Sequence, residues 1–323
     1  MLKYFALPFL ILLMISCGND DNDVTKVPPE KLVDQVIIDD AELTEYLATH
    51  FYEIENGPNG RINFILDTIA GDNAGKTPLL SQVSSKVINV SSIQFLLNDE
   101  EVDVPHKLYY LVLEGQEGVG ESPTIADSVF VRYQGRLLNG ISFDASSTGA
   151  WFDLPRLQFP QQGARGFAEG LTFFKSGMIA SEQPSDGSYL VEDFGAGLIF
   201  MPSGLAYFNQ SPTGIPFYSP LIFEINLLTV KKTDHDQDGI PSILEDVNQN
   251  GYLPDDNTDA ESERNSRSNL VADYQDPDDD GDGVLTRTEI SDADGNIILP
   301  YPDSNNDGIP DYLDPDIKRN PNN

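Results

Sequence analysis

The sequence predicts an α+β fold built mainly of antiparallel strands, and three features of the chain predict it. Val129, Val131 and Tyr133 alternate with Phe130 and Arg132, which is the period-two pattern of a half-buried strand. Asn139-Gly140 follows and is a strong hairpin signal, because both residues tolerate positive φ. An apolar run over residues 221–230 supplies a further strand.

Composition limits the number of domains and the class of partner. With 323 residues, 39% of them hydrophobic, the chain can form two or three domains with at least one core. The formal net charge of −34 would repel a phosphate backbone, so we expect no nucleic acid partner. Calcium or a basic surface suits this charge better.

Residues 1–17 have the pattern of a secretory signal. Lys3 precedes an apolar run over residues 4–15 that is too short to span a bilayer, and Ser16-Cys17-Gly18 follows. This junction resembles a bacterial lipobox, in which Cys17 becomes the lipid-bearing first residue, although Met14 stands where Leu is usual. The alternative is a buried cysteine in a membrane anchor. Cys17 is the chain's single cysteine, so no intrachain disulfide can form.

Residues 18–36 read as a flexible tether. They begin with GNDDND and contain Pro28-Pro29, a composition that cannot bury a core. The acidic run directly after Cys17 resembles a surface-export signal of some Gram-negative lipoproteins. A solvated linker is the equal alternative.

Residues 37–104 are predicted to form a small N-terminal α+β extension of unknown role. Asp39 and Glu42 fit a capping box, and an apolar face follows at Leu43, Tyr46, Leu47 and Phe51, which together predict one amphipathic helix. Residues 62–66 and 87–97 are strand-like. The extension either packs on the next domain or forms a dimerising or substrate-holding lobe.

Residues 105–231 hold the main domain. In chain order we expect an opening strand at 107–113, a Gly-rich loop at 114–126, the hairpin around Asn139-Gly140, a helix at 164–174 and a strand at 198–201 that ends at Pro202. Residues 178–197 are predicted to be an inserted hairpin or flap near the functional site.

Six short motifs occur in order within this domain. They are Tyr133-Gln-Gly135, Gly140-Ile-Ser-Phe143-Asp144, Gly166-Phe167-Ala-Glu-Gly170-Leu171, Ala206-Tyr207, Ile215-Pro216 and Leu221-Ile-Phe223. An ordinary sheet whose aromatic residues fill a core would need none of this order, so the ordered set favours a site.

The ordered motifs resemble the FKBP-type peptidyl-prolyl isomerase domain. The resemblance implies an antiparallel sheet curled around the helix at 164–174, and a pocket that needs no cofactor. It implies that Phe167 is the pocket floor, that Asp144 orients Tyr133 and faces the twisted amide, and that the Ile215 amide binds the substrate carbonyl. The implied catalytic residues are Tyr133, Phe143, Asp144, Phe167, Tyr207, Ile215 and Phe223. Another pocket aromatic is either Trp151 or Phe152.

Two features depart from the family pattern. Phe208 stands where Gly usually follows Ala-Tyr, and the insertion at 178–197 has no counterpart in a minimal domain. A domain that holds proline-containing segments without turning them over is therefore the alternative to an enzyme.

Residues 233–323 form an acidic tail with 24 Asp and Glu against 5 Lys and Arg. Three segments fit a calcium-loop template with oxygen ligands at positions one, three and five, Gly at six and an acid at twelve. The predicted metal ligands, counting position seven through its backbone, are Asp234, Asp236, Asp238, Ile240 and Glu245, then Asp278, Asp280, Asp282, Val284 and Glu289, then Asp303, Asn305, Asp307, Ile309 and Asp314. Asp246 to Asn257 is a weaker fourth frame.

The loops do not fit EF-hands, which need a helix on each side, because Pro241 and Pro310 lie inside two of the loops. The tail instead resembles thrombospondin type 3-like repeats, which implies calcium-dependent order with little apolar core. A solvated acidic tail is the alternative.

Together these features predict a peptidyl-prolyl cis-trans isomerase in the bacterial cell envelope. We expect a lipid anchor that holds it on the outer membrane, at the periplasmic face or the cell surface, and proline-containing proteins as substrates. The sequence specifies no oligomeric state. The alternatives are a non-catalytic chaperone or peptide-binding protein and a surface adhesion protein in which the calcium loops matter most.

Overall fold

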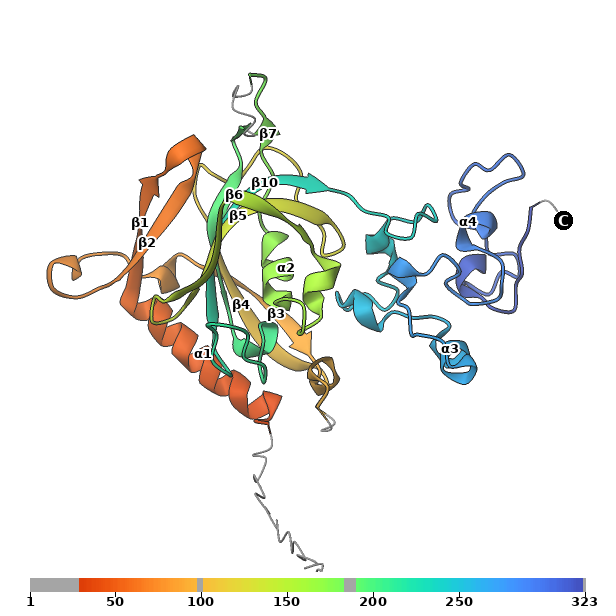
Figure 1. The fold of residues 1–323 in the computed structure, drawn as a ribbon, viewed down its shortest axis with the longest axis horizontal. Coiled ribbons are helices and arrows are strands. Elements are labelled where there is room, and N and C mark those ends of the chain that lie inside the picture. The colour runs from red at the N-terminus through yellow and green to blue at the C-terminus, as the bar shows by residue number, and fades with distance from the viewer. Residues whose placement is uncertain (1–28, 98–100, 183–189, 322–323) are drawn as a thin grey trace, which may run out of the picture.

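A six-stranded antiparallel sheet forms the centre of the molecule in the computed structural model, which describes residues 29–97, 101–182 and 190–321 (Figure 1). The strand order is β3-β4-β9-β10-β5-β6. The strands are β3 (Ser84–Val90), β4 (Val104–Val112), β9 (Gly195–Met201), β10 (Leu221–Lys231), β5 (Ser128–Leu137) and β6 (Ser142–Asp153). The α+β fold class predicted from the sequence is confirmed, and the signal and Cys17 lie outside the described residues.

Helix α2 (Arg165–Leu171) lies against one face of this sheet, which curls around it (Figure 1). Every residue of α2 is buried, and Phe167, Ala168 and Leu171 join a core cluster with the odd-numbered side chains of β10. This is the helix expected at residues 164–174, with shorter ends.

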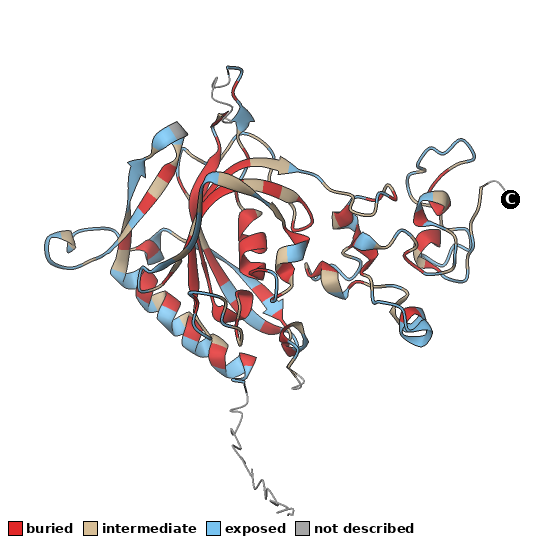
Figure 2. Ribbon diagram, viewed as in Figure 1, coloured by how far each residue is buried: buried red, intermediate tan, exposed pale blue. Residues whose placement is uncertain are grey.

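Helix α1 (Leu32–Thr49) and the hairpin β1 (His50–Asn56) and β2 (Ile62–Thr68) cover the other face of the sheet (Figure 1). Leu43, Tyr46 and Leu47 form a second core with Ile222 and Leu228 of β10. Both faces of β10 are therefore buried, which explains why apolar residues predominate along it (Figure 2).

Four details of the N-terminal prediction are wrong. Residues 32–36, expected in the tether, belong to α1, and of the strand-like stretch 87–97 only residues 87–90 lie in β3, because Ser92–Phe95 form a 3-10 turn. Asp39 does not cap a helix, because α1 begins at Leu32 and Asp39 is fully buried in its middle. Phe51 lies in β1 and not on the helix. The N-terminal segment also enters the central sheet, since β3 pairs with β4, so it is packed on the main domain and not a separate lobe.

Two buried polar side chains on β10 hold the hairpin in place. Asn226 accepts a hydrogen bond from the Ile62 amide at 2.8 Å and donates to the Ile62 carbonyl at 2.9 Å. Glu224 accepts from the Phe64 amide at 3.0 Å and pairs with Arg61 at 3.3 Å. An otherwise apolar strand thus satisfies the backbone of the layer above it.

The predicted insertion is a short hairpin of β7 (Met178–Ile179) and β8 (Val191–Glu192), and residues 183–189 of it lie outside the described residues. It begins beside Leu228, whose carbonyl accepts from the Gly177 amide at 3.0 Å. The expected position near the site is wrong for the described part, because the pocket lies at the Phe223 end of β10 and no hairpin residue lines it.

The tail is irregular, with two short helices, α3 (Ala260–Ser266) and α4 (Thr286–Glu289), among tight loops (Figure 1). It docks on the central domain through a small core in which Leu253, Ala272 and Tyr274 pack with Ile125 and Ala126. Lys232 also pairs with Asp127 at 2.8 Å. Among the described helices, none is long and apolar enough to cross a membrane.

Candidate functional site

An open pocket of about 370 Å³ lies where α2, β5, β6 and β10 meet the loop after β9. The structure brings together on its walls all seven residues that the sequence predicted for this site: Tyr133, Phe143, Asp144, Phe167, Tyr207, Ile215 and Phe223. Their roles in catalysis stay predictions.

Aromatic rings form the base of the pocket. The ring of Phe167 projects from α2 and lies 4.9 Å from Phe223, 5.3 Å from Phe152 and 5.9 Å from Tyr133, measured between ring centroids and in edge-to-face arrangements. Phe143 packs edge-on against Phe223 at 5.6 Å. Such contacts hold the rings in fixed positions and keep the floor apolar.

One charged group faces this apolar floor. The Tyr133 hydroxyl donates to Asp144 Oδ2 at 2.6 Å, and Asp144 Oδ1 accepts from the Ala145 amide at 2.8 Å. Burial raises the pKa of Tyr133, and the Asp144 carboxylate raises it further. The phenol therefore stays neutral at pH 7 and can act as a donor, with the carboxylate held in one orientation.

The Ile215 amide differs from the expectation. Its N–H donates to the Pro212 carbonyl at 2.9 Å, and the Ile215 carbonyl accepts from the Ser211 hydroxyl at 2.7 Å. A substrate carbonyl would have to share or replace the Pro212 acceptor, so the amide is not a free donor in this structure.

The ambiguity between two neighbouring aromatic residues is resolved. Phe152 lines the pocket, whereas Trp151 is 56% exposed and packs against Phe130. Because successive side chains of a strand point to opposite faces, only one of the two can face α2.

Sequence reasoning missed the wall formed by the segment before α2 and by the loop before Ile215. Its residues are Leu157, Gln162, Gly163, Ala164, Pro212 and Thr213. They lie in irregular segments that carry no periodic signal, and their direct proximity to the helix start and to Ile215-Pro216 is the signal that could have found them.

Phe208 does not obstruct the pocket. Its φ of 44° lies in the left-handed region that favours glycine, which accounts for the Gly common in the family. The side chain is buried between Phe95 and Tyr218, at 4.9 and 5.1 Å between centroids, and does not line the pocket. This departure therefore leaves the site open.

A second candidate site lies in the tail, where four loops each adopt the same kind of turn. In each, the first Asp accepts from the amide of the sixth-position Gly: Asp234 from Gly239, Asp246 from Gly251, Asp278 from Gly283 and Asp303 from Gly308, at 3.0 to 3.1 Å. These glycines have φ between 73° and 105°, a conformation that other residues rarely adopt.

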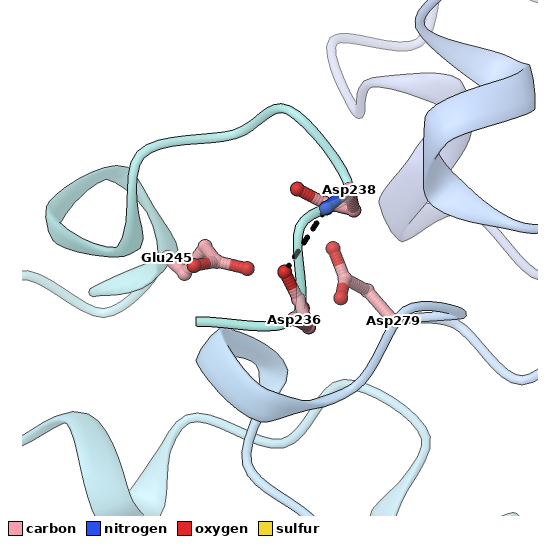
Figure 3. A group of neighbouring side chains, drawn as sticks. All are labelled: Asp236, Asp238, Glu245 and Asp279. Atoms are coloured by element: carbon pink, nitrogen blue, oxygen red, sulfur yellow. Dashed lines mark hydrogen bonds between the residues drawn. The ribbon is translucent and has the colours of Figure 1, made fainter. Parts of the chain in front are cut away.

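Within the described residues, carboxylates of the tail gather in three clusters, in each of which one ligand oxygen per residue lies within 4.8 Å of the others. The first contains Asp236, Asp238, Glu245 and Asp279 (Figure 3). The second contains Asp278, Asp280 and Asp282, and the third contains Asp259, Glu263 and Asp276. Asp279 and the third cluster were missed, because none of these residues occupies a ligand position of the template.

The remaining predicted ligands lie beside these clusters or in the third loop. Glu289 is buried, and the charges of Asp280 and Asp282 contribute to its raised pKa of about 8. In the third loop, Asn305 Nδ2 donates to Asp307 and Asp314, each at 2.9 Å. The backbone amides of Ile240, Val284 and Ile309 donate to the preceding loop aspartates.

The first two clusters fit a hard cation. Carboxylate oxygens of Asp236, Glu245 and Asp280 are buried with no hydrogen-bond partner within the described residues. Burial, and then neighbouring carboxylates, raises the pKa of Glu245 to about 9 and of Asp236 to about 7. Several oxygens that repel one another and lack donors are what calcium coordination requires.

Comparisons with known proteins separate the same two parts of the chain. The chain is 37% identical over 127 residues to the peptidyl-prolyl cis-trans isomerase Mip of Coxiella burnetii, covering 39% of this chain and 45% of that protein. It is 34% identical over 125 residues to the FKBP-type peptidyl-prolyl cis-trans isomerase FkpA of Escherichia coli, covering 38% of each. The chain thus spans less than half the length of these relatives.

Solved structures similar to part of the chain include FkpA of Escherichia coli, with 32% identity, a TM-score of 0.28, and coverage of 38% of this chain and 48% of that one. A peptidyl-prolyl cis-trans isomerase of Pseudomonas syringae has 25% identity and a TM-score of 0.29, and covers 39% and 76%. In the tail, the family model described as BamM C-terminal matches residues 235–302.

The sheet, the short helix and the aromatic pocket define a domain of the FKBP-like fold class. The sequence relatives support the FKBP-type peptidyl-prolyl isomerase family for the part of the chain that they cover.

Proposed function

We propose that this protein is a peptidyl-prolyl cis-trans isomerase whose active site is the aromatic pocket. The observation that carries the proposal is the Tyr133–Asp144 hydrogen bond of 2.6 Å directly above the Phe167 floor. The isomerase names of the sequence relatives support it.

The chemistry follows from the electronic structure of the X-Pro amide. Rotation about this bond faces a barrier of about 18–20 kcal/mol, because the amide resonance must be broken. The planar amide is more polar than the twisted one, so an apolar pocket destabilises the starting state relative to the twisted state. The oriented Asp144 carboxylate faces the carbonyl carbon of the twisted amide and stabilises it electrostatically. The reaction needs no nucleophile and no cofactor.

A protease-coupled isomerisation assay on a proline peptide tests this proposal. Turnover by the wild type should exceed the uncatalysed rate, and Asp144→Asn should reduce the catalysed turnover. Tyr110→Phe is a matched control for aromatic substitutions, because Tyr110 stacks on Phe173 outside the pocket. If the wild-type rate equals the uncatalysed one while the protein still binds the same peptide, the proposed isomerase activity is refuted. The protein would then be a non-catalytic peptide-binding protein.

We further propose a location in the bacterial cell envelope with a lipid on Cys17, so that proline-containing envelope proteins are the substrates. The lipobox-like junction after the apolar run supports this proposal. Mass spectrometry of the mature protein tests it, because a lipidated N-terminal Cys17 has a distinct mass and Cys17→Ser should abolish it. A free thiol at Cys17 would contradict the anchor.

The tail is proposed to bind calcium through the loops at 234–245, 278–289 and 303–314. The unpartnered buried carboxylate oxygens of the first two loops support this function. Calorimetry of the intact protein with millimolar calcium tests it, and the absence of any binding heat would leave a solvated acidic tail.

A further inference from the structure

We propose that Asp279, a residue of the second loop, is a ligand of the cation held by the first loop, so that one ion joins residues 234–245 to residues 278–289. This inference rests on the proposed calcium binding of the tail. It adds a ligand that the loop template does not contain.

The position of Asp279 carries the inference. Its carboxylate comes from a separate segment and points at Asp236 and Asp238, with Glu245 on the other side (Figure 3). The neighbouring Asp278 and Asp280 belong to a different cluster together with Asp282. The second loop therefore offers alternate side chains to two clusters.

The chemistry of Asp279 points to a ligand. Its side chain is 1% exposed, and both of its carboxylate oxygens lack a hydrogen-bond partner within the described residues. Glu245 is also 1% exposed, and both of its carboxylate oxygens likewise lack a hydrogen-bond partner within the described residues. Within the described parts of the chain, none of the four carboxylates of this cluster forms an ion pair within 4.0 Å. A buried carboxylate without a donor or a counter-charge is costly, and a shared cation removes that cost.

The ligand set selects the class of cation. All four side chains supply oxygen, and neither histidine nor cysteine belongs to the cluster. Oxygen-only sites rich in carboxylates suit calcium, which accepts a flexible arrangement of six to eight oxygens, whereas zinc favours nitrogen and sulfur. The proposed ion is therefore calcium.

Binding at this place would close a long stretch of chain. Residues 246–277 lie between the two loops and contain Leu253 and Tyr274, which pack on Ile125 of the central domain. A cation shared by Asp238 and Asp279 would hold both ends of this stretch together and thereby fix the docked part of the tail.

The test compares Asp279→Asn with Asp294→Asn in the intact protein. Both variants replace one aspartate of the tail by asparagine, but Asp294 is exposed and outside all three clusters. Calorimetry with calcium chloride measures the number and affinity of the bound ions, and thermal unfolding in chelator and in calcium measures stability. Asp279→Asn should weaken one calcium site about tenfold or more, because the charge of the ligand set controls calcium affinity.

The chelator measurement separates a ligand from a packing residue. Without calcium, Asp279→Asn should unfold at a higher temperature than the wild type, because it removes repulsion within the cluster. With calcium, it should gain less stability than the wild type and than Asp294→Asn. A lower melting temperature in chelator would show that Asp279 supports the fold without an ion, and would overturn the inference.

The outcomes distinguish this inference from the proposed function on which it rests. Wild-type protein that binds no calcium refutes both. Calcium binding that is identical in the wild type and Asp279→Asn refutes the cross-loop ligand alone and leaves the calcium-binding tail standing.

Discussion

Gly135 is required by the two aromatic rings beside it. A Cβ atom at this position would lie 2.5 Å from Phe143 Cζ and 2.9 Å from Phe223 Cε1, closer than packed carbon atoms allow. The glycine of the Tyr-x-Gly motif therefore lets Phe143 and Phe223 reach the pocket. At the scale of single residues, the glycine of this motif is therefore required by the packing of the site beside Tyr133.

The Tyr133 hydroxyl provides a prediction at the same scale. Tyr133→Phe keeps the ring packing and removes the hydrogen bond to Asp144. A hydrogen bond to a charged group contributes about 1.5 kcal/mol, so we expect kcat/KM for a proline peptide to fall about tenfold. Tyr110→Phe should retain the wild-type value. An unchanged rate in Tyr133→Phe would remove the oriented carboxylate from the mechanism.

At the scale of elements, α1 fixes the loop that carries Tyr207. The buried Asp39 Oδ2 accepts from the Ser203 amide at 2.7 Å and from the Ser203 hydroxyl at 2.6 Å. Ser203 begins a short 3-10 turn that leads directly to Ala206-Tyr207. The N-terminal extension thus takes part in positioning one wall of the pocket.

Asp39→Asn should therefore destabilise the protein. Asp39 accepts at both oxygens, from Ser203 at Oδ2 and from Gln35 Nε2 at Oδ1, whereas the amide nitrogen of Asn accepts no hydrogen bond. One side of the Asn side chain therefore leaves its donors without an acceptor, and a buried donor without a partner costs about 1–3 kcal/mol. Chemical denaturation should show a loss in this range. Asp34→Asn, an exposed change on the same helix, should be neutral, and equal losses in both variants would deny the special role of Asp39.

The tail loops give a prediction about pH. Burial and neighbouring carboxylates raise the pKa of Glu245 to about 9 and of Glu289 to about 8 in the folded state, from 4.5. Between about pH 4.5 and pH 9 the folded tail then binds more protons than the unfolded one, so its stability falls as the pH rises. Thermal unfolding in chelator should show this fall, and calcium should suppress it. Stability that rises with pH in chelator would contradict the raised pKa values.

At the scale of the whole molecule, the tail is docked on the wall of the pocket domain. Gln158 is buried, and its amide donates to the Gly251 carbonyl at 2.9 Å and accepts from the Leu253 amide at 3.1 Å. Arg165, the first residue of α2, donates to the Asn250 and Gly251 carbonyls and lies over the Tyr252 ring. These contacts attach the tail segment at residues 250–253 directly to the central domain.

Calcium should therefore stabilise the intact protein. Sites with a Kd of about 10⁻⁴ M contribute about 2.7 kcal/mol each when calcium exceeds Kd a hundredfold. At about 10 mM calcium we expect a higher melting temperature and protection of residues 233–321 from proteolysis, with chelator reversing both. Identical cleavage patterns with calcium and with chelator would refute a calcium-ordered tail.

The sequence by itself determined the features that depend on short-range patterns. Strand alternation, the Asn139-Gly140 turn and the glycine at position six of each calcium loop are local properties of the backbone, and all three occur where predicted. The ordered motifs likewise identified seven of the residues that line the pocket, because these motifs specify side chains and turns together.

Tertiary structure decided what depends on contacts between distant segments. Asp39 looked like a helix cap but bonds to Ser203, 164 residues away, and the Ile215 amide is used by its own loop. Asp279 faces a cluster formed by a loop more than thirty residues earlier, which no spacing within its own loop could indicate. Local patterns fix which backbone conformation a segment adopts, whereas the partner of a buried polar group is set by the whole fold that surrounds it.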